Sequence, residues 1–260
     1  MLEGALVLWF SLTLLSLIFV VYDQFTNTPS MRVMTLAWAL IILYTGPIGL
    51  FFYFLSCRQP MPGTHDAFIS SHWKQALGSE IHCVAGDATA IIIMAAILSK
   101  YDLPNGIESI IEYAAAYLFG LLIFQALFMR SMFSSYKEAV MRTIFAETIS
   151  MNAVMAGMLP TILICKHIFP EGGNPSTLLF WGIMSLATLM GSLFAYPVNS
   201  WLVRIGIKHG MMSIPQEGEH MHHHEPAKLP LHQQIKWTVL SFIGLFGIGW
   251  LASLIIPLRF

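Results

Sequence analysis

The chain has 260 residues, of which 56% are hydrophobic and only 10% are charged. Soluble domains carry about 25% charged residues, so this composition excludes an ordinary soluble domain and indicates a polytopic membrane protein. The formal net charge of −1 gives no electrostatic basis for binding nucleic acid. The three cysteines, Cys57, Cys83 and Cys165, are far apart and form neither a disulfide framework nor a CxxC metal knuckle.

Seven apolar segments follow one another, separated by polar or Pro/Gly-containing connections. About 20 residues cross a bilayer, so seven helices account for nearly the whole chain. We therefore predict an all-α bundle of about seven transmembrane helices that forms one transmembrane domain over residues 1–260. The predicted spans are Leu2–Val21, Met31–Ser56, Lys74–Leu98, Ile107–Phe128, Lys137–Ile168, Ser176–Ile205 and Ile235–Ile256.

The first two spans carry features of their own. Leu2–Val21 lacks a basic region before it and a good cleavage site after it, so we interpret this segment as an anchor rather than a signal peptide. The second span contains Thr45-Gly46-Pro47, a sequence that predicts a kink in the helix.

The Lys and Arg residues predict how the spans are oriented. In a seven-span scheme, the connections on one side hold nine of these residues and the other side holds four, namely Arg32, Lys100, Lys166 and Arg259. By the positive-inside rule, the side with nine faces the cytoplasm. We therefore expect the N-terminus in the cytoplasm, the C-terminus outside, and the long hydrophilic loop 208–233 in the cytoplasm.

The third span carries ionisable groups inside a segment that is otherwise fit to cross a bilayer, namely Glu80, His82, Cys83 and Asp87. At about 100° per residue, Glu80, Cys83 and Asp87 share one helical face and His82 lies on the opposite face. A charged residue costs at least about 3 kcal/mol at the middle of a lipid-facing helix, so neither face can contact hydrocarbon. We therefore predict that this helix lies in the centre of the bundle.

The fifth span adds a second set of unusual side chains, with Glu147 and Asn152 among them. The third and fifth spans run in the same direction in the predicted topology. At 1.5 Å per residue, Glu147 then comes to a depth similar to that of His82, and Asn152 to that of Asp87. These four side chains are therefore candidates for one embedded site.

Sulfur and imidazole groups in these two spans suit a soft metal ion. Thioether, thiolate and imidazole are ligands of Cu(I), and the candidates are His82, Cys83, Met151, Met155 and Met158. Our leading hypothesis is a transporter or membrane-embedded binding protein for a soft transition metal, with Cu(I) the first choice. The alternative is that the methionines fill the core and that His82 is a structural histidine.

The carboxylates support a different function. Ionisable groups inside a membrane mark proton or ion pathways, so Glu80, Asp87, Glu112 and Glu147 are candidates for a proton or cation relay, with Asn152 as a further polar gate. The alternative function is a proton- or cation-coupled carrier of a small solute. A third class is a non-transporting scaffold or assembly protein, in which the polar side chains only hold the helices together.

The hydrophilic loop 208–233 contains a histidine run. His220, His222, His223 and His224 form a metal-binding tract by composition, because clustered imidazoles bind transition metals. The other interpretation is a solvated loop that binds metal only in vitro.

The sequence gives little support for an enzyme. Cys83 and His82 are adjacent, which points them to different faces of a helix, so they cannot form a nucleophilic dyad. Only His82 lies deep within a span, so bis-histidine ligation of haem lacks a second imidazole. We predict no catalytic residues. The expected partners are the lipid bilayer and a small ion or solute, and a homo-oligomer is left open.

Several separate motifs resemble one membrane-protein family of bacteria and archaea. They are His82-Cys83-Val84-Ala85-Gly86-Asp87-Ala88-Thr89, Glu112-Tyr113, Phe124-Gln125-Ala126-Leu127-Phe128-Met129, Ser150-Met151-Asn152-Ala153-Val154-Met155-Ala156-Gly157-Met158 and Tyr196-Pro197-Val198-Asn199. In these motifs the chain is similar to domain of unknown function 4396, over about residues 68–210. The resemblance implies a polytopic protein of a prokaryotic inner membrane, and it implies no activity.

Overall fold

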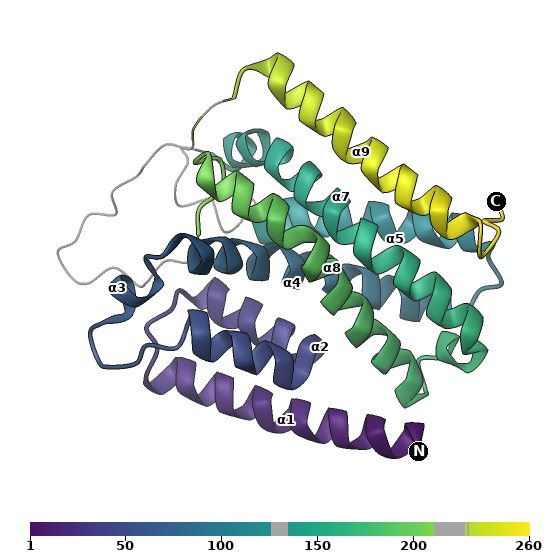
Figure 1. Ribbon diagram of the computed structural model, residues 1–260, viewed down its shortest axis with the longest axis horizontal. Coiled ribbons are helices and arrows are strands. Elements are labelled where there is room, and N and C mark those ends of the chain that lie inside the picture. The colour runs from purple at the N-terminus through teal and green to yellow at the C-terminus, as the bar shows by residue number, and fades with distance from the viewer. Residues whose placement is uncertain (126–134, 211–226, 228) are drawn as a thin grey trace.

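The computed structural model describes residues 1–125, 135–210, 227 and 229–260, and the regular structure in this part is helical (Figure 1). Seven of the described helices are long and apolar enough to cross a membrane, which confirms the predicted all-α, multi-pass bundle. They are α1 (Leu2–Thr26), α2 (Arg32–Ser56), α4 (His72–Leu98), α5 (Asn105–Phe119) with its π-helical continuation η1 (Gly120–Gln125), α7 (Tyr136–Ile168), α8 (Leu178–Arg204) and α9 (Leu231–Ser253). Two short helices, α3 (His65–Ile69) and η3 (Pro170–Gly173), lie in connections.

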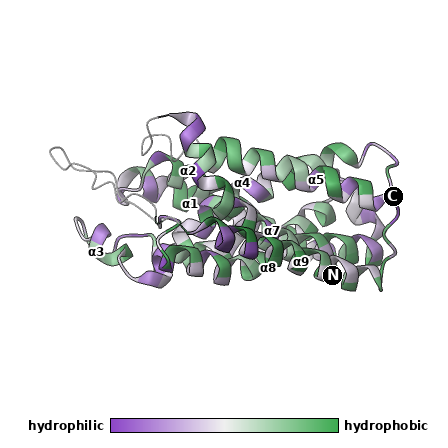
Figure 2. Ribbon diagram, turned by 90° about the horizontal axis from the view of Figure 1, so that it is seen from above, coloured by the Kyte–Doolittle hydropathy of each residue, from purple (hydrophilic) through white to green (hydrophobic). Residues whose placement is uncertain are grey.

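Helix α4 lies at the centre of the bundle, as its ionisable residues predicted. It contacts α2, α5, α7 and α8. Every residue from Ala76 to Ala88 is buried, whereas most of α1 and α9 is exposed on the outside. Figure 2 shows hydrophobic residues along the lengths of the helices and hydrophilic residues around α3. Glu80, His82, Cys83 and Asp87 of α4 are therefore all buried within the bundle.

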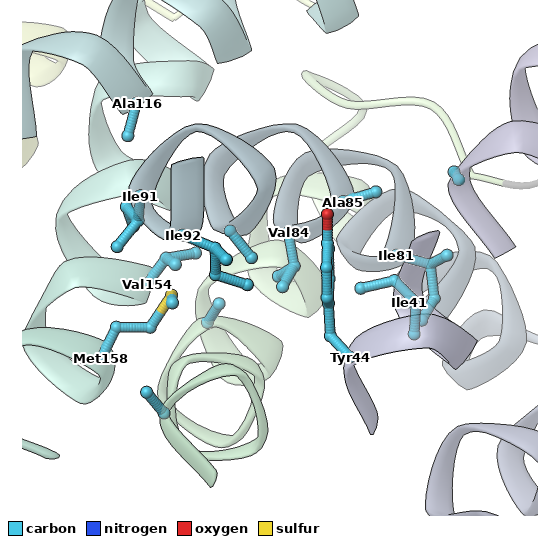
Figure 3. Close-up of a cluster of buried hydrophobic side chains, with 14 of the residues drawn as sticks. Ile41, Tyr44, Ile81, Val84, Ala85, Ile91, Ile92, Ala116, Val154 and Met158 are labelled. Atoms are coloured by element: carbon cyan, nitrogen blue, oxygen red, sulfur yellow. The ribbon is translucent and has the colours of Figure 1, made fainter. Parts of the chain in front are cut away.

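The core around α4 is closely packed. Figure 3 shows side chains of α4 such as Val84 and Ile92 in one buried cluster with Val154 and Met158 of α7. Helices α7 and α8 approach through glycine, because a Cβ on Gly157 would overlap the backbone of α8. Small residues let transmembrane helices come this close.

Helix α2 doubles back on itself instead of crossing the bundle with a kink. Gly46 has φ +55° and ψ −134°, a conformation open to glycine, and it reverses the chain before Pro47. The rings of Trp38 and Tyr53 lie 5.2 Å apart, although 15 residues of continuous helix would separate them by about 22 Å. Near the end of the second half, Tyr53 donates a 2.6 Å hydrogen bond to Asp23 at the end of α1. The two halves of α2 are therefore antiparallel.

This reversal places both ends of the described chain at the same end of the bundle (Figure 1). Each half of α2 is about 21 Å long or less, shorter than the ~30 Å hydrocarbon core of a bilayer. At the shared end, Gly106 N–H donates to the carbonyl of Arg259 over 2.9 Å, and Leu6 of α1 lies against Gly182 near the start of α8. Seven straight crossings would have placed the two ends on opposite sides.

Candidate functional site

Five buried polar residues meet where α4, α7, η1 and the chain after α8 come together. They are Cys83 and Asp87 from α4, Glu147 from α7, Asn199 from α8 and Lys208. All five side chains are almost entirely excluded from solvent. We call this group the acid–lysine site.

Lys208 reaches the site because α8 ends in a glycine turn. Gly206 has φ +72°, and the backbone N–H groups of Ile207 and Lys208 both donate to the carbonyl of Leu202, as at a helix C-terminus closed by a left-handed glycine. The turn directs the chain back toward the bundle. The Lys208 side chain is only 2% exposed as a result.

The ammonium group of Lys208 contacts three polar side chains. Its Nζ lies 2.8 Å from Cys83 Sγ, 2.9 Å from Asn199 Oδ1 and 4.0 Å from Glu147 Oε2. Burial disfavours the charged form and lowers the pKa of Lys208, but the acidic groups around it outweigh burial and leave this pKa above its usual value. Lys208 therefore stays positively charged in the site.

Asp87 and Glu147 form a carboxyl pair against Gly120. A Cβ at Gly120 would overlap both Asp87 Oδ1 and Glu147 Oε1, so the two carboxyl groups lie side by side. Among the described residues, no group hydrogen-bonds to either oxygen of Asp87 or to Glu147 Oε1. The π-helical segment η1 begins at Gly120, and such segments are frequent at functional sites.

The charges in the acid–lysine site do not balance when both acids are ionised. Asp87 and Glu147 would carry two negative charges and Lys208 one positive charge, in a place without water-exposed surface. An uncompensated buried charge costs several kcal/mol, roughly, so the site needs one more positive charge. A proton shared by the two carboxyl groups supplies it, and so would a bound monovalent cation.

Polar contacts continue from the acid–lysine site in two directions. Ser150 of α7 donates to Asn199 Oδ1 over 3.1 Å. Toward the other end, Asn152 accepts a 2.8 Å hydrogen bond from Tyr113 and donates one of 2.9 Å to Ser241 of α9. Asn152, predicted as a polar gate, thus ties α5, α7 and α9 together.

The structure separates two predicted relay residues from the carboxyl pair. Glu112 is buried on α5, in the region where Glu108 and Lys166 form a 3.9 Å ion pair. Glu80 shares a helical face with Asp87 but lines a cavity between α2, α4 and α8. Because neighbouring helices cross α4 at an angle, positions two turns apart meet different neighbours.

The predicted soft-metal ligands do not converge on one point. The ring of His82 packs at 5.7 Å from that of Phe124 in η1, while Cys83 faces Lys208. Met151 and Met155 are buried in the hydrophobic core, and Met155 also borders a cavity between α5, α7 and α9. In the described part of the chain, no group of three or more His, Cys, Asp or Glu side chains could hold a metal ion.

Met158 and the histidine run are the remaining predicted ligands. Met158 packs against Gly191 of α8 and belongs to the apolar cluster of Figure 3. His220, His222, His223 and His224 lie outside the residues that the structure describes.

Sequence reasoning missed three residues of the acid–lysine site and its surroundings. Lys208 was one of the nine Lys and Arg residues of the connections on the cytoplasmic side, Asn199 entered only as part of a motif, and Gly120 was not among the candidates. The one available signal was a glycine shortly before Lys208, since a helix that ends in glycine turns sharply. That signal does not say whether the following side chain enters the bundle.

The model of one protein family, Domain of unknown function (DUF4396), matches residues 72–208, which is more than half of the chain. The chain belongs to the DUF4396 family. This confirms the resemblance seen in the sequence motifs, and the match runs from the start of α4 to Lys208. All five residues of the acid–lysine site therefore lie inside the DUF4396 region. Searches of curated proteins and of solved structures return no match.

Proposed function

We propose that this DUF4396 protein is a proton-coupled carrier of a small solute in the cytoplasmic membrane of a prokaryote. The Asp87–Glu147 pair is its proton-binding group, and Lys208 is the fixed counter-charge. One observation carries the proposal: two buried carboxyl groups lie side by side, and one ammonium group is 4.0 Å from the nearer of them, Glu147. Ionisable groups buried in membrane proteins commonly mark proton relays.

The contacts of Lys208 suggest how proton loss would be transmitted. In the structure, Lys208 Nζ is held by Cys83 and Asn199 at 2.8 and 2.9 Å, and Glu147 lies further away at 4.0 Å. Removing the proton leaves Glu147 fully charged and strengthens its attraction for the ammonium group. Lys208 then moves toward Glu147 and away from Asn199 of α8. Protonation is thereby coupled to the position of α8 relative to α4 and α7.

The surroundings offer a polar route toward the end that carries the chain termini. From Gly120 beside the pair, α5 runs toward that end through Tyr113, which donates to Asn152, and through the buried Glu112. An open cavity of about 1250 Å³ at that end has Glu108 and Lys166 in its lining. Buried polar groups followed by an open cavity are the arrangement that proton access requires.

A soft-metal carrier has less support. The ammonium group of Lys208 lies 2.8 Å from Cys83 Sγ, where it would repel a cation bound by that sulfur. The thioethers of Met155 and Met158 pack against different neighbours. The metal hypothesis therefore remains as an outcome for experiment to exclude.

The doubled-back α2 supports a different orientation from the one expected for seven crossings. With α2 entering and leaving at one end, Arg32 joins the Lys and Arg residues of the connections at that end. The count becomes ten against three, and the three are Lys100, Lys166 and Arg259. By the positive-inside rule, we propose that both termini lie outside and that loop 208–233 lies in the cytoplasm.

Reporter fusions test this orientation. Alkaline phosphatase, active only outside the cytoplasm, is expected to be active when fused after Phe260, and green fluorescent protein at the same place is expected to stay dark. A fusion within loop 208–233 should give the opposite pattern. Both schemes place the C-terminus outside, so the N-terminus separates them. A cysteine that replaces Glu3, exposed at the start of α1, should react with a membrane-impermeant maleimide in intact cells beyond the wild-type background. Protection of that cysteine would instead support seven crossings.

A pH-jump experiment tests proton binding without knowledge of the solute. Proteoliposomes adsorbed on a solid-supported membrane are expected to give a transient current on a pH step, because protons enter the embedded pair. Asp87→Asn and Glu147→Gln should abolish the current. Glu138→Gln is the matched control, since its carboxyl is partly exposed at the start of α7 and lies off the proposed route, and it should keep the current. Equal currents from all four proteins would overturn the proposal.

A further inference from the structure

A cavity of about 410 Å³ lies between the two halves of α2, α4 and α8, apart from the acid–lysine site. Its lining is almost wholly apolar, with one carboxyl group, that of Glu80. Phe52, Trp73 and Leu193 line the cavity and are also exposed on the outer surface of the bundle. In a membrane this surface contacts lipid, so the cavity is open to the bilayer.

Glu80 is the unusual feature of this cavity. The residue is 2% exposed, and its Oε2 has no hydrogen-bond partner among the described residues. The nearby hydroxyl of Thr45 donates to its own helix, at the carbonyl of Ile41. A buried carboxyl group without a donor is costly, so Glu80 needs either a proton or a cationic partner.

The shape and chemistry of the cavity restrict the partner. An inorganic cation such as Mg²⁺ or Ca²⁺ requires several oxygen ligands, whereas the lining offers one carboxyl and the hydroxyls of Thr45, Ser192 and Tyr196. A purely apolar molecule would leave Glu80 without a donor. A molecule with an apolar body and one ammonium group satisfies both the lining and the carboxylate.

We propose that this cavity binds a lipophilic amine, with its ammonium group on Glu80 and its apolar body against α2 and α8. The binding step balances in protons: the protonated carboxyl of Glu80 releases its proton when it takes up the ammonium ion. The amine reaches the cavity from the bilayer, past Leu193.

The cavity also identifies the solute class of the proposed carrier, and this part rests on the proposed function. Glu80 lies one helical turn from Cys83, whose sulfur contacts Lys208. The ammonium ion takes the place of the proton of Glu80, so binding leaves the net charge of the cavity unchanged. A proton delivered through the Asp87–Glu147 pair returns Glu80 to its protonated form when the amine leaves. The expected consequence is exchange of an amine cation for a proton.

Binding of octylamine to the full chain in lipid nanodiscs tests the site. Octylamine carries an ammonium group at neutral pH, and octanol is the neutral ligand of the same length. We expect saturable octylamine binding above that of empty nanodiscs, with proton release, and at least about tenfold weaker binding of octanol, because a hydrogen bond to a charged group contributes about 1.5–3 kcal/mol.

Three variants complete the test. Glu80→Gln and Leu193→Trp are both expected to weaken octylamine binding about tenfold or more, the first by removing the charge and the second by filling the opening. Leu186→Trp, at an exposed leucine of α8 outside the cavity, is the matched control and should bind as wild type does. Leu193→Trp keeps Glu80, so it remains informative if Glu80→Gln does not fold.

Two results would overturn the amine site: equal binding of octanol and octylamine, or unchanged octylamine binding in Leu193→Trp. Failure of the carrier proposal looks different. In that case Asp87→Asn and Glu147→Gln keep the pH-jump current, while octylamine binding to Glu80 persists.

Discussion

Asp23 and Asp87 are both buried aspartates of this bundle, but their surroundings differ. Asp23 accepts hydrogen bonds from Tyr53 at 2.6 Å and from Thr28 and Arg58 at 2.8 Å each. Asp87 has no donor among the described residues, and the one positive charge near it, on Lys208, also serves Glu147. Asp23 therefore has several donors and a counter-charge of its own, whereas Asp87 has no donor and only a shared counter-charge.

The comparison separates a structural acid from a functional one. The bonds of Asp23 join the end of α1 to the returning half of α2, so they hold the reversal at Gly46 in place. A carboxylate that accepts several hydrogen bonds and has a counter-charge is stable without a proton. Asp87, in contrast, is satisfied only when a proton or another cation is present. The predictions that follow test this difference, from the largest expected effect to the smallest.

Asp23→Ala is expected to have the largest effect on folding. It leaves Tyr53 and Thr28 without their acceptor and Arg58 without its partner, so the free energy of unfolding should fall by about 3–5 kcal/mol. Thermal unfolding in nanodiscs measures the loss. Asp87→Asn should unfold at or above the wild-type temperature, because it removes a buried carboxyl group that has no hydrogen-bond donor. The reverse order of the two variants would contradict the comparison.

Lys208→Met should destabilise the protein by less, about 2 kcal/mol, because the acid–lysine site can take up a second proton in place of the lost ammonium. Adding Glu147→Gln to Lys208→Met is expected to recover part of the loss. With glutamine at position 147, only Asp87 needs a proton to make the site neutral. A double-mutant cycle on unfolding free energies gives the coupling. Strictly additive effects would show that Lys208 does not act through Glu147.

Gly120→Ala should cost about 1–3 kcal/mol, because its Cβ overlaps both carboxyl groups and forces them apart. It is also expected to reduce the pH-jump current. Gly244→Ala is the matched control: nothing lies within 4 Å of a Cβ there, and alanine favours a helix. Equal stability changes in the two variants would mean that Gly120 does not bring the carboxyl groups together.

Met155→Leu combined with Met158→Leu should have the smallest effect. Leucine replaces methionine in an apolar core at less than about 1.5 kcal/mol per site. Copper bound by protein purified under copper loading should not change, as measured by elemental analysis. Stoichiometric copper in wild type that these substitutions remove would revive the soft-metal carrier.

Much of the fold could be predicted from the sequence, and α2 shows where such prediction stops. Apolar runs fix the seven helices, and charges inside an apolar run fix the central place of α4. A run of 25 apolar residues has the same composition whether it crosses the bilayer or doubles back. Thr45-Gly46-Pro47 predicted a kink, but only the contact of Trp38 with Tyr53 reveals a full reversal.

Only the acidic residues of the acid–lysine site could be predicted from the sequence. Asp87 and Glu147 stand out because carboxyl groups are rare in apolar helices. Lys208 lies in a hydrophilic stretch where a lysine is unremarkable in sequence, and its inward direction depends on the turn at Gly206. A counter-charge supplied by a loop cannot be recognised from periodicity, since loops have none.

Infrared difference spectroscopy across a pH titration tests most directly whether the Asp87–Glu147 pair holds a proton. The account predicts a carboxyl C=O band in wild type that disappears as the pair loses its proton. In a Glu80→Gln background, which removes the other buried carboxyl group expected to be protonated, the band should be absent when Glu147→Gln or Asp87→Asn is added, and present when Glu138→Gln is added. A carboxyl band that persists unchanged after Glu147→Gln and after Asp87→Asn in that background would contradict the account.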